Sequence, residues 1–199
     1  MNISSIFGFL AGITALVAYG LYFKQAFKNQ STPNPATWSI WFFIGIINTV
    51  TFFSVTNNNI WQSFIVIAVT FSLFIVVLYA FLRGKFSKIT KIEIVVFVLA
   101  LAIGIFWQIT SNDRMSNLLL QGIYVISYIP TVTGIITGRV KEHQAAWATV
   151  VIAYSFSTLA LVFGTQIDWV AFVHPIVNGL LGNGVIVALI LLKKSGKIK

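Results

Sequence analysis

Cysteine is absent from this chain of 199 residues, which excludes disulfide bonds, thiolate metal sites and cysteine nucleophiles. Charge is scarce as well: Asp, Glu, Lys and Arg make up 9% of the residues, whereas hydrophobic residues make up 58%. So few polar side chains cannot cover the core of a soluble protein of this length. The composition therefore indicates an integral membrane protein, with no long polar segment left for a soluble domain.

Seven long stretches of the sequence are apolar and nearly free of charge. A membrane-spanning helix needs about 20 apolar residues, and its backbone groups must be hydrogen-bonded within the segment because lipid offers no partners. We therefore expect an all-α membrane protein with seven transmembrane helices. The predicted spans are residues 5–23, 36–55, 60–82, 92–110, 116–138, 145–164 and 168–192.

The cations are confined to one set of connections between these stretches. All of the 13 Lys and Arg residues except Arg114 fall in alternate gaps or in the C-terminal tail. Short loops rich in Lys and Arg stay in the cytoplasm, so we expect the N-terminus outside and the C-terminus inside a cell inner (plasma) membrane. Membrane topology and anionic lipid headgroups account for the net charge of +9, so the expected partner is the lipid bilayer and not nucleic acid.

Aromatic landmarks recur at a nearly constant spacing, which indicates an internal repeat. We expect two parallel three-helix repeats, residues 1–90 and 113–199, joined by a linker helix at 91–112. Tryptophans near the ends of predicted spans have a simpler explanation, because amphipathic rings prefer the membrane interface; these are Trp38, Trp41, Trp61, Trp107 and Trp169. The recurring pairs are Tyr22 and Tyr128, Trp38 and Trp147, and Trp61 and Trp169.

Uncharged polar and aromatic side chains occur deep inside the predicted spans. An amide or hydroxyl in hydrocarbon needs a hydrogen-bond partner, which is either a neighbouring helix or a bound solute. Neutral amides, hydroxyls and aromatic faces suit a small neutral polar solute, such as a sugar or a nucleoside-like vitamin. The candidate substrate-binding residues are Asn48, Thr70, Tyr124, Trp147, Tyr154, Asn178 and Asn183.

Charged side chains are missing from the interior of every predicted span, and Asp113 and Glu142 are assigned to loops. Ion-coupled transport commonly uses a buried carboxylate, so this absence favours a facilitator. No metal or other cofactor is expected. His174 lies inside the last span and is either a proton site or a hydrogen-bonded packing residue.

Two segments resemble a known motif. Residues 128–131 read Tyr-Ile-Pro-Thr, which resembles the Tyr-x-Pro-Gln motif of the PQ-loop superfamily, and residues 22–25 read Tyr-Phe-Lys-Gln, with Lys24 in place of proline. Residues 32–41 resemble a pattern of uncharacterised seven-helix bacterial proteins. Proteins of this superfamily share the expected arrangement of three helices, one linker helix and three helices, so the resemblance extends over nearly the whole chain. The superfamily includes the SWEET sugar transporters and, in a related arrangement, the PnuC-type vitamin transporters.

The resemblance implies roles for several residues. In SWEET-type proteins an Asn on the third helix of a repeat and an aromatic residue on the second line the sugar pocket. Asn178 matches that Asn and Thr70 takes its place in the first half, with Trp147 and Tyr154 as the aromatic candidates. Alternating access between the repeats is then expected. The candidate gate and hinge residues are Tyr22, Tyr128, Pro130 and Pro175.

Other functions were weighed against transport. A retinal protein needs a Lys in its seventh helix, and residues 170–192 have none. An intramembrane enzyme is not expected, because no metalloprotease motif, serine-hydrolase elbow or aspartate pair lies in the spans. A receptor, scaffold or assembly subunit without a substrate is the main alternative. The sequence leaves open whether the protein forms a homo-oligomer.

Overall fold

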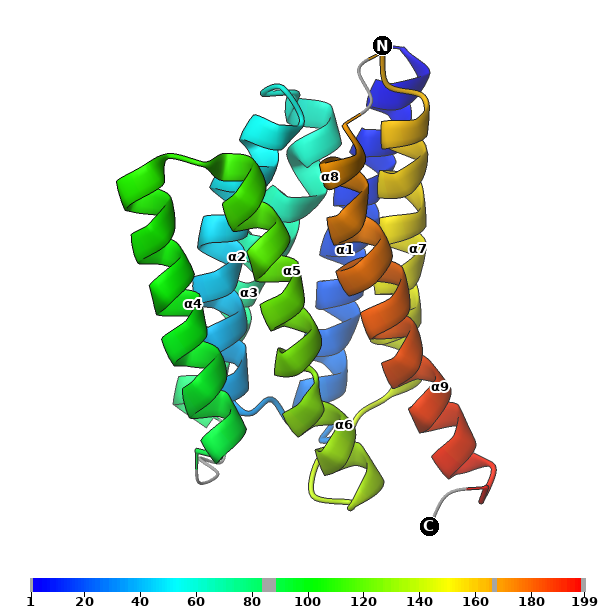
Figure 1. The fold of residues 1–199 in the computed structure, drawn as a ribbon. Helices are drawn as coiled ribbons and strands as arrows, with labels where there is room; N and C mark the ends of the chain where they lie inside the picture. The colour runs from blue at the N-terminus through cyan, green and yellow to red at the C-terminus, as the bar shows by residue number, and fades with distance from the viewer. Residues whose placement is uncertain (1, 84–88, 166–167, 198–199) are drawn as a thin grey trace.

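The computed structural model describes residues 2–83, 89–165 and 168–197, and over these ranges it is helical without β-strands (Figure 1). Seven helices are long and apolar enough to cross a membrane, which confirms the predicted all-α, multi-pass membrane protein. Lys85, Lys88 and Lys199, which contribute to the predicted charge asymmetry, lie outside the described residues. The helices are α1 (Ile3–Phe27), α2 (Pro35–Val55), α3 (Ile60–Arg83), α4 (Lys91–Thr110), α5 (Asp113–Ser127), α6 (Ile129–Ile136), α7 (Gln144–Val162), α8 (Trp169–Val173), η1 (His174–Gly182) and α9 (Asn183–Lys194).

Two of the seven spans are interrupted, each near a proline. The fifth span consists of α5 and α6, which meet at Tyr128 just before Pro130. The seventh span consists of α8, the π-helical segment η1 and α9, and Pro175 lies at the start of η1. Proline lacks a backbone N–H and so cannot continue the regular hydrogen-bond ladder of a helix.

Short polar side chains cap the starts of several helices. Asn34 accepts a hydrogen bond from the Ala36 amide before α2, and Asp168 does the same for the Val170 amide before α8. Thr90 and Glu93 form a reciprocal capping box at the start of α4. These caps satisfy amide groups that a helix start leaves without partners.

Glu93 also ties α4 to the start of α2. Its Oε1 accepts hydrogen bonds from the Thr37 hydroxyl at 2.6 Å and from the Asn34 amide at 3.1 Å. The side chain is only 2% exposed, although the sequence places it simply at a helix end. The Glu93 side chain therefore fastens α4 to the start of α2.

Six spans form a closed ring, and α4 packs outside it against α2 and α5 (Figure 1). Around the ring, α1 contacts α3, α3 contacts α2, and α2 contacts α5 of the fifth span. The fifth span then contacts η1 of the seventh span, the seventh contacts α7, and α7 returns to α1. The first and sixth spans are therefore neighbours, although they lie far apart in the sequence.

The two ends of the ring differ in their loops and their packing. We call the end that carries residues 28–34, residues 137–143 and the C-terminus the basic end (bottom in Figure 1), and the opposite one the amino-terminal end. A cluster of buried apolar side chains fills the half toward the amino-terminal end, and it includes Ala11, Phe52, Ile65, Leu161 and Val170. The other half is lined by larger aromatic side chains and is hollow, as described below.

Candidate functional site

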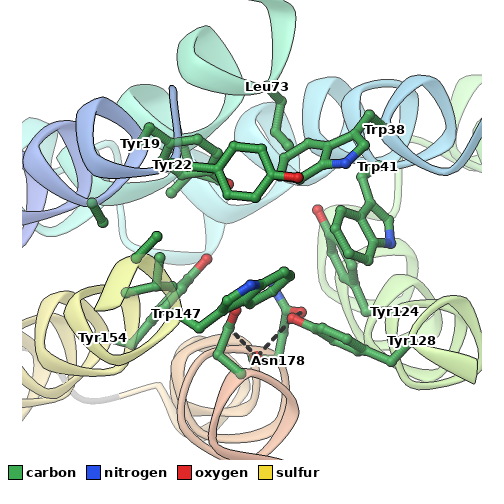
Figure 2. Close-up of a pocket in the computed structure, with 15 residues that line it drawn as sticks. Tyr19, Tyr22, Trp38, Trp41, Leu73, Tyr124, Tyr128, Trp147, Tyr154 and Asn178 are labelled. Carbon is green, nitrogen blue, oxygen red and sulfur yellow. Dashed lines mark hydrogen bonds between the residues drawn. The ribbon is translucent and has the colours of Figure 1, made fainter. Parts of the chain in front are cut away.

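A cavity lies at the centre of the ring, in the half nearer the basic end. All six ring spans contribute to its wall, and among the described residues none from α4 does. About 50 Å³ is open to the centres of water molecules, several times the ~10–15 Å³ that one water needs. Figure 2 shows labelled side chains pointing from the surrounding helices toward a common centre. The lining residues are Ala18, Tyr19, Tyr22, Trp38, Trp41, Val69, Leu73, Tyr124, Tyr128, Ala146, Trp147, Val150, Tyr154, Asn178 and Asn183.

The wall of this central cavity is aromatic and uncharged. Tyrosine and tryptophan rings cover most of it, and the other polar side chains are the amides of Asn178 and Asn183. Ring faces provide flat apolar contact area, while phenol and indole groups add hydrogen bonds at its edge. Such a wall can hold a compact neutral solute by stacking and by a few hydrogen bonds.

Two tyrosine hydroxyls on the wall remain free to bind a solute. Among the described residues, neither the Tyr19 hydroxyl on α1 nor the Tyr124 hydroxyl on α5 has a hydrogen-bond partner. Neither oxygen belongs to the fully enclosed polar atoms that lack partners, so each of them borders open space. These two hydroxyls come from different parts of the ring and offer both donors and acceptors to a bound molecule.

Asn178 organises the seventh-span side of the cavity. Its Oδ1 accepts a hydrogen bond of 2.9 Å from the Tyr128 hydroxyl, and its backbone oxygen lies 3.2 Å from the same hydroxyl. The Asn183 amide donates to the backbone oxygens of Asn178 and Gly179, at 2.9 and 3.0 Å. These bonds satisfy carbonyls inside the π-helical segment, and they hold Asn178 against the cavity (Figure 2).

Glu142 lies just beyond the end of the cavity that faces the basic end, and we call that end the mouth. Its Oε1 accepts a hydrogen bond from the Tyr22 hydroxyl at 3.2 Å, and its Oε2 accepts one from Trp147 Nε1 at 3.0 Å. Both donors line the central cavity, whereas the carboxylate itself lines a small vestibule beyond it with Trp38, Trp41 and other residues. The carboxylate therefore joins α1 to α7 at this end of the cavity.

Burial changes the proton affinity of this carboxyl group. Partial burial raises the pKa of Glu142 from 4.5 to about 7, and the hydrogen bond from Trp147 opposes that rise only in part. Glu142 is thus a loop residue in the sequence but a titratable part of the site in the fold. Sequence alone gave no sign of this, because the acid becomes enclosed only when residues 137–143 fold back over the ring.

A hydrogen-bonded network closes the cavity toward the amino-terminal end. His174 Nδ1 lies 3.0 Å from Gln121 Oε1, and the Gln121 amide donates to Asn48 Oδ1 at 3.0 Å. The Asn117 amide donates to the same oxygen at 3.2 Å. Because Gln121 Oε1 can only accept, the network assigns the proton of His174 to Nδ1. His174 Nε2 faces the Tyr154 hydroxyl at 3.4 Å, so the network touches the cavity wall through Tyr154.

The sequence-predicted site residues separate into two groups in space. Five of the seven substrate-binding candidates line the cavity: Tyr124, Trp147, Tyr154, Asn178 and Asn183. Two others lie elsewhere. Asn48 is held in the buried network, and the Thr70 hydroxyl bonds to Thr49 at 2.8 Å and to the Gly45 carbonyl at 3.1 Å between α2 and α3. Both polar groups serve contacts between helices, which was the alternative left open for them.

The gate candidates also take different positions. Tyr22 and Tyr128 line the cavity, and Pro130 lies in the vestibule wall toward the basic end. Pro175 and His174 are buried in the seventh span but are not among the residues that line the cavity. Hinge motion at the prolines and proton binding at His174 stay predictions.

Trp38 and Trp41 require a correction, because both were interpreted as membrane-interface anchors. They are 5% and 7% exposed and form part of the cavity wall, whereas Trp61 and Trp169 are 37% and 62% exposed. Trp41 Nε1 donates a hydrogen bond of 2.8 Å to the Ser127 hydroxyl, which fixes its ring between α2 and α5. A tryptophan near a helix end can be a membrane-interface anchor or part of the cavity wall. The two roles differ only in the direction of the side chain, which the sequence does not show.

Comparison with protein families, with curated proteins and with solved structures finds no match to this chain. The assignment of the site therefore rests on its own geometry. That geometry is a central aromatic cavity with free hydroxyls, a carboxylate at its mouth and a packed polar network behind it.

Proposed function

We propose that this protein is a plasma-membrane facilitator that moves a small neutral polar solute by alternating access through the central cavity. In this proposal residues 1–90 and 113–199 are two parallel three-helix repeats and residues 91–112 are the linker. The basic end faces the cytoplasm, which places the C-terminus inside and the N-terminus outside, as the distribution of Lys and Arg favours.

The order of spans around the ring supports the two repeats. In the first half α3 lies between α1 and α2, and in the second half the seventh span lies between the fifth and the sixth. Moving three places around the ring exchanges the first span with the fifth, the second with the sixth and the third with the seventh. Every ring contact is retained under that exchange, as expected for a duplicated unit with α4 outside it.

The cavity itself is the observation that carries the proposal. Binding sites of many transporters lie between the repeats, where both can move around a fixed solute. Here the free hydroxyls come from both halves, Tyr19 from the first and Tyr124 from the second. A protein that only needed a stable bundle would gain more by filling this space with side chains, since empty volume inside a core costs stability.

The chemistry of the wall supports a neutral solute. No charged side chain is among the residues that line the cavity in the described part of the chain. Stacking on tryptophan and tyrosine rings suits the flat faces of sugars and nucleoside-like vitamins, and the hydroxyls suit their polar edges. The present volume is small, so solute binding requires the rings at the mouth to separate.

A thermal-shift screen of the purified protein tests the proposal against its main alternative, a receptor, scaffold or assembly subunit. The panel holds neutral sugars, nucleosides and vitamins, and a quaternary ammonium compound, because aromatic cages also bind such cations. We expect a dose-dependent rise in melting temperature for one neutral class, since a ligand at about 100 times its Kd stabilises the folded state by about 2.7 kcal/mol.

The matched control for this screen is Tyr19→Phe combined with Tyr124→Phe, which removes the free hydroxyls and keeps both rings. Loss of two hydrogen bonds worth about 1 kcal/mol each should weaken binding about 30-fold. No response across the panel by well-folded protein would favour the receptor or scaffold. A response to the ammonium compound alone would contradict a neutral solute.

A further inference from the structure

Within the ranges that the structure describes, Glu142 at the mouth is the acidic residue that is hydrogen-bonded to side chains of the cavity wall. Glu142 receives one hydrogen bond from Tyr22 on α1 and another from Trp147 on α7, at 3.2 and 3.0 Å. Both side chains must move if the cavity is to open toward the basic end, because Trp147 lies between the cavity and the vestibule, and Tyr22 is hydrogen-bonded to the carboxylate that lines the vestibule. Opening the mouth therefore transfers Glu142 from a partly buried site to water.

Besides Tyr22, four titratable groups lie around Glu142 in the described part of the chain, and none of them pairs with its carboxylate. Lys141 and His143 flank it in the loop, while Lys193 and Lys194 approach from α9 across a shared hollow. Among the described residues, no cation lies within 4 Å of the carboxylate. Lys193 Nζ is instead 2.5 Å from the Ile135 carbonyl, at the end of α6. Among the described residues of the first half, Tyr22 is the titratable group in contact with Glu142, since the vestibule residues from that half are uncharged.

His143 is also engaged elsewhere. Its Nδ1 accepts a hydrogen bond of 3.3 Å from the Ala145 amide at the start of α7, and lies 3.2 Å from the Gln25 amide. A carboxylate that is partly removed from water and has no cation beside it favours a proton as its counter-charge, although the hydrogen bonds that it accepts from Trp147 and Tyr22 act in the opposite direction.

We propose that Glu142 is a proton-binding site that controls the mouth of the cavity: it holds a proton while the mouth is closed and releases it to water at the basic end as the mouth opens. This proton site would regulate the proposed transport function. It rests on that proposal only because it takes the cavity as the path of the solute. It makes opening toward the basic end depend on the pH there.

The direction of the effect follows from the two environments of the carboxyl group. In the closed mouth burial raises its pKa to about 7, and in the open, hydrated mouth the pKa returns toward 4.5. The closed state therefore binds the proton more tightly, so acid favours closure and the preference is lost as the pH rises from 4.5 through 7. Between about pH 5.5 and 8 the ratio of open to closed mouths should rise about 25-fold.

Because the natural sequence has no cysteine, one introduced cysteine can report on the opening. In Val150→Cys the thiol replaces a side chain of the cavity wall, and in Ser195→Cys it lies on the exposed tail. A polar maleimide reacts with both proteins in detergent, and the ratio of the two rates removes the pH dependence that the two thiols share. We expect this ratio to rise about 25-fold between about pH 5.5 and 8.

Glu142→Gln in the Val150→Cys protein is the decisive variant, since the amide has the same shape but cannot titrate. Its labelling ratio should change less than about threefold over the same range, whereas His143→Asn, which still caps α7, should retain the rise. A rise that persists in Glu142→Gln, disappears in His143→Asn or is missing from the parent would overturn the proton site.

The assay uses no solute, so its outcome is separate from that of transport. If labelling depends on pH but the protein binds nothing in the thermal-shift panel, the proton site is supported and the facilitator function is contradicted. If labelling does not depend on pH but the protein binds one neutral class of compound, only the proposed proton site is contradicted.

Discussion

Asn178→Ala is expected to lower uptake into proteoliposomes at least about 30-fold, for whichever compound gives the largest thermal shift. The substitution removes the amide that faces the cavity and the Oδ1 that accepts the Tyr128 hydroxyl at 2.9 Å. Two hydrogen-bonding roles worth about 1 kcal/mol or more each are lost together. The Tyr128 ring, freed on one side, is also less well placed against the solute.

The folded protein should survive this change. The backbone oxygen of residue 178 already lies 3.2 Å from the Tyr128 hydroxyl and stays available as an acceptor. Ser155→Ala on α7 is a matched control, because its hydroxyl bonds only within the helix to the Val151 carbonyl and does not line the cavity. Unchanged uptake by Asn178→Ala, with Ser155→Ala also normal, would remove Asn178 from the binding site.

Gly179→Ala is expected to destabilise the protein by about 1–3 kcal/mol and to abolish solute binding. A Cβ at this position would overlap Tyr154 at Cγ and Cβ, the part of the side chain nearest the α7 backbone. Rotation of the ring cannot relieve that overlap, so α7 and the seventh span must separate. Tyr154 forms part of the cavity wall, and the separation therefore deforms the site itself.

Gly184→Ala, five residues further along the seventh span, is the matched control. A Cβ at position 184 meets no other atom within 4 Å. Since alanine is a better helix former than glycine by about 1 kcal/mol, this variant should be as stable as the parent or more stable. Thermal unfolding in detergent separates the two variants. Equal melting temperatures would show that the contact between η1 and α7 is looser than described.

Hydropathy alone was sufficient to predict the helices, because a membrane span must be both long and apolar. The ends of α2 and α4 agree with the prediction to within a residue or so, since prolines, asparagines and a capping box fix them locally. The order of the spans around the ring could not be predicted in this way. Nearly every face of these helices is apolar, so the sequence carries little information on which face meets which neighbour.

The site was predictable in its chemistry and only partly in its members. Asn178 and Tyr154 could be found because a polar group deep in a span needs a partner. The same rule selected Asn48, which satisfies it through Gln121 and Asn117 and not at the cavity. Glu142 could not be found, since its enclosure depends on a loop that folds over α1 and α7.

Alternating access is the central claim, and labelling from both sides of the membrane tests it most directly. An impermeant maleimide is applied to sealed right-side-out and inside-out vesicles that carry Val150→Cys. Two exposed positions calibrate the sides: Thr165→Cys at the amino-terminal end and Ser195→Cys at the basic end. We expect Thr165→Cys to react only from outside, Ser195→Cys only from inside, and Val150→Cys from both. Labelling of Val150→Cys from one side alone, with both calibrating positions reactive as expected, would contradict transport through this cavity.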